Sequence, residues 1–267
     1  MSSQIALVFI FTFVIHLIST LAYSVRIAGA RTGRVAVSLS LFNILILFSR
    51  TANSLQGPLL AKHVEEDILR GTTAGAVTDF RWVLLASTLA TIIGGLLIPT
   101  AQRLFSTAVE AFDVYRSIPR LVLRVFTASG LEHIRQAVTV PAKENILQIR
   151  STRRVPVTLL VANTIGAALL SVGVLASLYA GYLTPELRST SSNLSALVNG
   201  FSTILLMIFI DPYLSVLTDD VANKRTSGAF LRKCVTLFAV TRLIGTVLAQ
   251  FLLVPAAHLI ALTAHLL

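Results

Sequence analysis

Long, uninterrupted stretches of apolar residues dominate the chain and predict its architecture. Six of them approach or exceed the ~20 residues that an α-helix needs to cross ~30 Å of hydrocarbon. Their approximate limits are residues 4–25, 35–56, 82–100, 155–183, 194–216 and 234–262. A spanning β-barrel would require apolar and polar residues to alternate, and these stretches are continuously apolar. The pattern therefore predicts an all-α, polytopic membrane protein with six transmembrane helices.

Composition supports membrane insertion and narrows the class of function. Hydrophobic residues make up 55% of the 267 residues and charged residues only 13%, whereas a soluble domain carries roughly 25% charged residues. Because the net charge of +10 lies on a membrane protein, it concerns topology and anionic lipid, and we expect no nucleic-acid partner. The single cysteine, Cys234, excludes an internal disulfide framework.

The basic residues of the loops predict the orientation of the chain. Lys and Arg gather in the first, third and fifth loops, whereas the second loop is mixed and the fourth contains only Arg188. Because cytoplasmic loops carry an excess of Lys and Arg, we expect the odd-numbered loops in the cytoplasm. Both termini of this multi-pass protein are then expected outside the plasma membrane.

The long third loop divides the chain into two halves. Within it, Leu104, Phe105, Ala108 and Phe112 recur at helical spacing. Amphipathic helices in the cytoplasmic interface fit this pattern, and a solvated connector is the alternative. We therefore expect a first three-helix transmembrane repeat over residues 1–100, a cytoplasmic or interfacial connector over 101–154, and a second three-helix repeat over 155–267.

The two halves resemble each other locally. Residues 57–60 match residues 211–214, and residues 96–101 match residues 252–257 at nearly the same displacement. Because each half has three spans, the second copy enters the membrane from the opposite face. This arrangement is an inverted repeat, a common ground plan of secondary transporters. An old duplication that now serves only packing is the alternative.

A polar run follows the apolar part of the second span. Arginine at membrane depth is costly and usually faces a protein interior or a water-filled cavity. It binds phosphate with two hydrogen bonds and stays charged in a low-dielectric site. We therefore predict that an anionic head group is bound by Arg50, Thr51, Asn53 and Gln56. The alternative is that Arg50 reaches the lipid headgroups.

Further polar residues lie in other spans. Arg242 is a second intramembrane cation, assigned to the same binding site, and an ion pair with Asp211 is its alternative role. His16 and Asp211 are candidates for proton coupling, although a lone histidine more often serves helix packing. Proline in a span frees a carbonyl and permits a kink, and the alternative is a helix end. The candidate hinge residues are Gly57, Pro58 and Pro212.

Sequence motifs of several enzyme classes are absent. The chain contains no G-x-x-x-x-G-K-[ST] phosphate loop, no H-E-x-x-H or paired Cys/His metal spacing, and no G-x-S-x-G elbow. We therefore predict a protein that is not an enzyme and that requires no metal or other cofactor.

Three segments resemble a known family. A-Y-S-V-R-I-A-G-A-R-T-G at residues 22–33, S-L-F-N at 40–43 and S-R-T-A-N at 49–53 are similar to the alternate lipid II flippase (Amj) family of bacteria. The resemblance implies transfer of lipid II, the undecaprenyl-pyrophosphate-linked peptidoglycan precursor, from the cytoplasmic to the outer leaflet of the cell membrane. It supplies no set of binding residues.

Other functions remain open from the residues. The chain could instead transport a small soluble solute, or serve as a membrane scaffold that docks cytoplasmic partners on residues 103–154. Six spans are few for enclosing so large a headgroup, so a homodimer is a candidate assembly.

Overall fold

Helices form the architecture of the part of the chain that the structure describes. The structure is a computed structural model and describes residues 3–115, 135–139 and 154–267. Its elements are α1 Ser3–Thr32, α2 Val35–Arg70, η1 Thr73–Gly75, α3 Ala76–Tyr115, α7 Val157–Leu183, η3 Pro185–Leu187, α8 Arg188–Leu205, the π-helical η4 Leu206–Ile210, α9 Asp211–Ala222 and α10 Gly228–Leu266. Within the described ranges, 6 helical segments are long and apolar enough to cross a membrane. The predicted all-α fold with six spans is confirmed.

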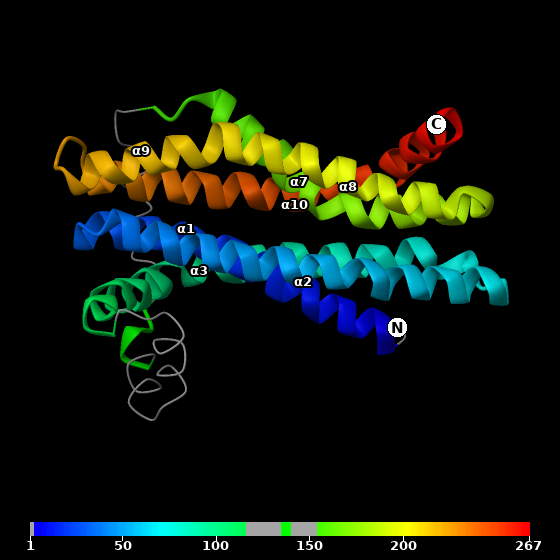
Figure 1. The fold of residues 1–267 in the computed structure, drawn as a ribbon, viewed down its shortest axis with the longest axis horizontal. Coiled ribbons are helices and arrows are strands. Elements are labelled where there is room, and N and C mark those ends of the chain that lie inside the picture. Colours follow the sequence, from blue (N-terminus) through cyan, green and yellow to red (C-terminus); the bar gives the residue numbers. More distant parts are fainter. Residues whose placement is uncertain (1–2, 116–134, 140–153) are drawn as a thin grey trace.

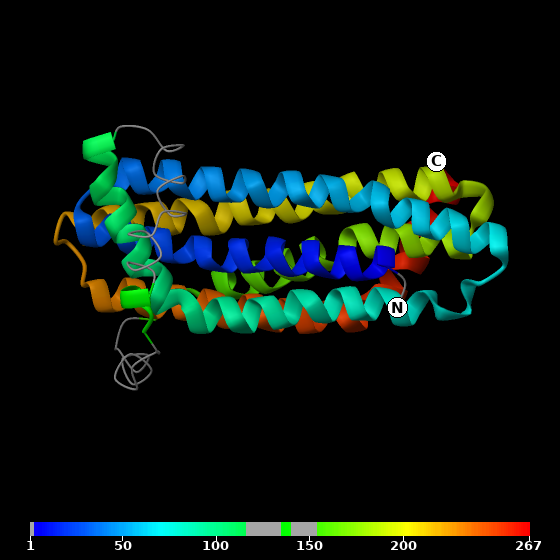
Figure 2. The same cartoon turned by 90° about the horizontal axis from the view of Figure 1, so that it is seen from below.

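The two halves form two layers (Figure 1). Helices α1 to α3 make one layer and α7 to α10 the other, and in each half the first helix packs most extensively against the third and then against the second. Corresponding helices run in opposite directions, so that α1 begins and α10 ends at the same end of the bundle (Figures 1 and 2). These directions and the shared packing order support the inverted repeat, which stays a prediction.

The helices extend beyond the apolar stretches. α1 continues to Thr32 and α2 continues to Arg70. Exposed ion pairs of Glu66 with Lys62 and Arg70, at 3.8 and 3.6 Å, accompany the last turns of α2. Gly71 then ends the helix in the left-handed conformation, with φ 67°. Apolarity marks the part of a helix in lipid rather than the whole helix, so the expected ends at residues 25 and 56 were too early.

A proline bends the third helix of each half. Pro99 lies inside α3 and Pro255 inside α10, and beyond each proline the helix changes direction (Figure 1). The end of α3 crosses one end of the bundle (Figure 2), where Nη1 of Arg34 lies 3.3 Å from the carbonyl oxygen of Glu110. The third helix therefore continues to Tyr115 instead of ending near residue 100. Residues 116–134 and 140–153 of the expected connector lie outside the described residues.

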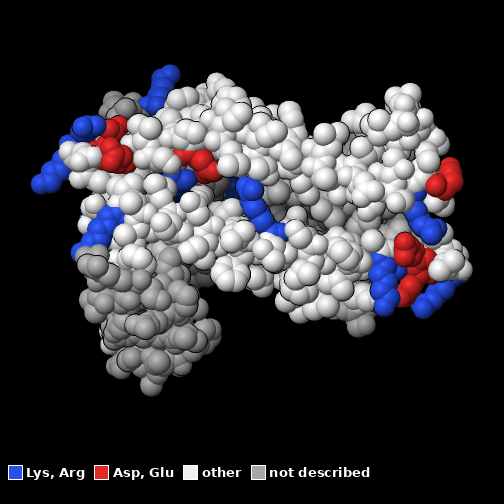
Figure 3. Space-filling model, viewed as in Figure 1, with Lys and Arg blue, Asp and Glu red and all other residues white. Residues whose placement is uncertain are grey.

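Charged residues mark the ends of the bundle. On the face seen in Figure 3, most Lys, Arg, Asp and Glu side chains gather at the two ends, and the middle is largely uncharged.

Small residues bring the helices together between these ends. A Cβ atom at Gly245 of α10 would lie 2.5 Å from the carbonyl oxygen of Thr164 in α7, so that only glycine permits this approach.

Candidate functional site

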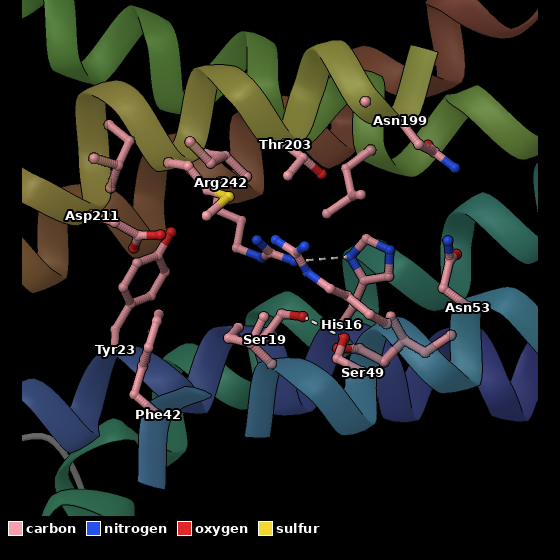
Figure 4. Close-up of a pocket in the computed structure, with 18 of the residues that line it drawn as sticks. His16, Ser19, Tyr23, Phe42, Ser49, Asn53, Asn199, Thr203, Asp211 and Arg242 are labelled. Atoms are coloured by element: carbon pink, nitrogen blue, oxygen red, sulfur yellow. Dashed lines mark hydrogen bonds between the residues drawn. The ribbon is translucent and has the colours of Figure 1, made fainter. Parts of the chain in front are cut away.

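A cavity of about 370 Å³ lies between the two halves. We call it the central cavity. Helices α1 and α2 form one wall, and α7, α8, η4 and α10 contribute to the other. Figure 3 shows a cleft between the layers in the middle of the face that α2 and α8 share. Its charged and amide-bearing side chains are His16, Arg50, Asn53, Asn199, Asp211 and Arg242 (Figure 4).

The polar run in α2 is divided between two faces of the helix. Ser49 and Gln56, seven residues apart, both face α1. The hydroxyl of Ser49 lies 2.9 Å from that of Ser19, and Nε2 of Gln56 donates to Oγ1 of Thr12 at 2.9 Å. Arg50 and Asn53 line the central cavity, and Ser49 also contributes to its wall, whereas Gln56 does not.

Two of the predicted binding residues therefore lie outside the cavity lining. Thr51 is exposed, and its hydroxyl donates to the carbonyl oxygen of Leu47 at 3.0 Å. Gln56 is buried against Thr12. Both residues follow Arg50 in the sequence, but a helix turns their side chains away from the cavity.

Arg242 is a buried cation in the wall of the cavity. It is 3% exposed, and its Nη2 atom lies 3.5 Å from Nδ1 of His16. Among the described residues, no acceptor bonds to its Nε atom, and no carboxylate lies within ion-pair distance of the guanidinium. Burial of an unpaired guanidinium costs several kcal/mol unless a negative group compensates it. The arrangement favours an anionic ligand.

Arg50 contributes a second guanidinium from the opposite wall. It lines the cavity and is exposed, and it forms no ion pair with any other described residue. Because α2 continues to Arg70, Arg50 lies near the middle of its helix rather than toward its outer end. The two arginines come from different halves of the protein, so an anion between them would contact both halves.

Arg26 is a buried, charged neighbour of the cavity that the sequence did not single out. The span expected over residues 4–25 would leave Arg26 in the first loop, but it lies inside α1 and is 2% exposed. Its Nη2 atom is 3.1 Å from Oδ1 of Asp211, Nη1 donates to the hydroxyl of Ser215, and the guanidinium lies 4.3 Å from the centre of the Phe42 ring. The first strong turn signal after it is Gly33, with φ 71°, which could have placed Arg26 within the helix.

Asp211 therefore pairs with Arg26, and the alternative ion pair between Arg242 and Asp211 is wrong. The pair joins α1 of one half to α9 of the other. Because Asp211 is occupied by Arg26, it leaves Arg50 and Arg242 available to a ligand.

The candidate hinges lie within long spans rather than at helix ends. Pro58 is inside α2, which continues for another three turns beyond it. Pro212 is in the first turn of α9, directly after the π-helical η4, and π-helical turns often occur at functional sites. Gly57 precedes Pro58, and a Cβ atom there would meet nothing within 4 Å. The alternative reading of both prolines as helix ends is wrong, and the hinge role stays a prediction.

A hydrogen-bond network joins α1, α7 and α10 next to Arg242 in the wall of the cavity. The amide nitrogen of Asn163 in α7 donates to the carbonyl oxygen of Phe238 and to the hydroxyl of Thr241, at 2.9 and 2.8 Å. Tyr23 of α1 donates to the amide oxygen of Asn163 at 3.1 Å. Because Thr241 precedes Arg242, the network fixes the segment of α10 that presents Arg242. No cluster of His, Cys, Asp or Glu in the described part of the chain is arranged to hold a metal ion.

Comparison with known proteins identifies relatives of this chain. A family model described as Amj, alternate to MurJ, matches residues 11–264. A protein of Bacillus subtilis (strain 168) named lipid II flippase Amj is 35% identical over 268 residues, which cover 97% of this chain and 96% of that protein. No solved structure matches the chain.

Proposed function

We propose, because the chain belongs to the Amj (alternate to MurJ) family, that it is a lipid II flippase of the bacterial cell membrane. Lipid II consists of an undecaprenyl chain, a pyrophosphate and a disaccharide-pentapeptide. Its transfer between leaflets breaks no covalent bond. The protein must therefore bind the headgroup, expose it alternately to the two sides and exclude ions meanwhile, and it needs no catalytic residue for this task.

The buried, unpaired guanidinium of Arg242 is the observation that supports this function most directly. Together with Arg50 it places two permanent positive charges in one cavity. Guanidinium groups bind phosphate oxygens with paired, charge-assisted hydrogen bonds. A pyrophosphate presents two phosphates, so one arginine from each half can bind one of them. The substrate's own charge then compensates the cost of burying Arg242.

Amide and hydroxyl groups around the arginines suit the sugar and peptide. Asn53 from α2 and Asn199 from α8 lie on opposite sides of the cavity (Figure 4). The Oδ1 atom of Asn199 is buried and accepts no hydrogen bond within the described residues. A sugar hydroxyl could satisfy it. At about 370 Å³ the cavity is near the low end of the roughly 300–1,000 Å³ of ligand pockets, so the whole headgroup requires a wider state or a homodimer.

The prenyl chain can stay in lipid while the headgroup is inside. Helices α2 and α8 flank the cleft of Figure 3 and barely contact each other. Their exposed residues include large apolar side chains, among them Phe48 at 65% and Phe201 at 56% exposure. A lateral gap between two lipid-facing helices allows the tail to slide along the bilayer as its head crosses.

Contacts between the halves at both ends of the bundle support alternating exposure. At one end Arg26 pairs with Asp211, and at the other the hydroxyl of Tyr182 donates to Asp67 at 2.9 Å. The loop charges predict that the Arg26 end faces the cytoplasm and that both termini lie outside. Binding that favours one state over the other is sufficient to move the site between sides. His16 and Asp211 remain candidates for proton coupling.

The function is tested in cells depleted of their usual lipid II flippase. We expect the wild-type chain to restore growth and the outer-surface accessibility of lipid II, and Arg50→Ala and Arg242→Ala to lose this rescue at unchanged protein level. Arg81→Ala is the matched control, because Arg81 is an exposed arginine outside the cavity. Full rescue by both cavity variants would remove the arginines from the mechanism. Uptake of a water-soluble compound with no effect on cell-wall synthesis would favour the small-solute alternative.

A further inference from the structure

A second cavity lies between α3 and α10, on the side of the bundle away from α2 and α8 (Figure 2). We call it the rear groove. Its volume is about 300 Å³. Most of its wall is apolar, including Ile92, Leu96 and Val240, which are 41%, 57% and 46% exposed. It is separate from the central cavity, and the proposed transport of a headgroup makes no use of it.

The length and position of the rear groove match one leaflet of a bilayer. Along α10 it extends from Arg232 to Leu243, and along α3 from Gln102 to Thr91. Eleven residues of α-helix rise about 16 Å, which is about half of the ~30 Å hydrocarbon thickness. A groove of this length that starts at the headgroup level, at the end of the bundle where α10 begins, reaches about the middle of the membrane.

The charged and amide side chains of the groove lie at that second end. Arg232 lies four residues after the start of α10, and Gln102 faces it from α3 just beyond the Pro99 bend. A guanidinium and an amide at the level of the lipid headgroups complement an anionic phosphate and its glycerol. The other end of the groove offers hydrocarbon contacts from residues such as Leu243 and Ile92.

We propose that the rear groove binds an anionic phospholipid of the leaflet at the Arg232 end, with one acyl chain between α3 and α10 and its phosphate on Arg232. The apolar wall, the one-leaflet length and the single terminal cation together specify this occupant. Lipid bound here packs against the third helix of both halves, so it stabilises the contact between the two layers.

Gly95 offers a direct way to close the groove. It lines the groove from α3, and a Cβ atom added to it would meet nothing within 4 Å. Replacement by leucine therefore fills the space that an acyl chain would occupy without a clash in the bundle, and it does not weaken the helix. Gly75 is the control, because it lines neither cavity and a Cβ atom there would also meet nothing within 4 Å.

The test is native mass spectrometry of the purified full chain, titrated with dioleoylphosphatidylglycerol or dioleoylphosphatidylcholine. We expect the wild type to bind one phosphatidylglycerol about five-fold more tightly than phosphatidylcholine. Arg232→Gln should bind both lipids equally, because the positive charge that contacts the lipid phosphate is lost. Gly95→Leu should lose the tight lipid altogether, and Gly75→Leu should bind as the wild type does.

Two results would overturn the proposal. One is an undiminished preference for phosphatidylglycerol in Arg232→Gln together with unchanged binding in Gly95→Leu. The other is a lipid-free dimer that Gly95→Leu dissociates, since it would show that a second copy covers the groove. Because the readout is lipid binding by the purified protein, it is independent of whether the chain transports lipid II.

Discussion

The central cavity and the rear groove lie in the same interface between two layers of helices and have similar volumes, about 370 and 300 Å³, but they differ in where their cations lie. The central cavity has Arg242 and Arg50 near the middle of their helices, whereas the rear groove has one arginine, Arg232, close to a helix end. The arginines of the two cavities therefore differ in their expected depth in the membrane, and this difference suits them to different ligands.

The physical reason is the cost of a charge at each depth. An arginine near the end of a span reaches the headgroup region, where it is inexpensive and attracts anionic lipid. An arginine near the middle cannot reach it and remains only where a cavity, a partner or a ligand compensates the charge. The rear groove is therefore suited to a lipid that stays in one leaflet, and the central cavity to an anion that crosses.

The variant with the largest expected effect removes the carboxylate of Asp211, which is the one carboxylate among the described residues that line the central cavity. Asp211→Asn leaves Arg26 buried without its ion pair, and we expect the protein to lose about 2 kcal/mol of stability. This is less than the roughly 3–5 kcal/mol for a fully buried pair, because the Asp211 side chain is 37% exposed. Thermal unfolding in detergent measures the change. Asp220→Asn is the control, since Asp220 pairs with the exposed Arg225 at 3.8 Å, and an equal effect of the two variants would contradict the buried-pair assignment.

Exchange of arginine for lysine sharpens the comparison. Lysine keeps the charge but loses the planar fork that binds two oxygens. We expect Arg242→Lys to reduce the flipping rate about ten-fold, in line with the loss of one charge-assisted hydrogen bond. Arg232→Lys should retain the preference for phosphatidylglycerol, because a headgroup cation at the membrane surface acts mainly through its charge. Equal tolerance of lysine at both positions would remove the distinction between the two cavities.

The smallest expected effect concerns two neighbours in α2. Asn53 lines the central cavity, whereas Thr51 is exposed and bonds to its own helix. We expect Asn53→Ala to lower the flipping rate a few-fold, about the value of one neutral hydrogen bond, and Thr51→Ala to leave it unchanged. Flipping assays on reconstituted vesicles measure both variants. A larger loss in Thr51→Ala than in Asn53→Ala would show that another face of α2 meets the substrate.

Much of the membrane architecture could be predicted from the chain alone. The all-α fold and the six spans follow from apolar length, whereas the connector over residues 101–154 stays a prediction. The helix ends could not be predicted in this way, because residues 57–70 of α2 are helical although many are polar. The continuous helix through Pro99 was missed for a related reason: in α3 the proline bends the helix instead of ending it.

The candidate site was predictable in part. Arg50, Asn53 and Arg242 all line the central cavity, and each was conspicuous as a polar residue in an apolar stretch. Gln56 was equally conspicuous but bonds to Thr12 in α1. Arg26 was missed because it was thought to lie beyond the end of its helix, although it supplies the ion pair of Asp211.

The sequence by itself determined that the chain crosses the membrane as helices and that several polar residues lie within it, because hydrocarbon excludes unpaired backbone groups and charges regardless of the fold. Only the tertiary structure decided which of those residues face one another. A helix directs side chains around its full circumference, and the neighbours that receive them belong to helices far away in the chain. The same polar run therefore became cavity wall at Arg50 and helix contact at Gln56.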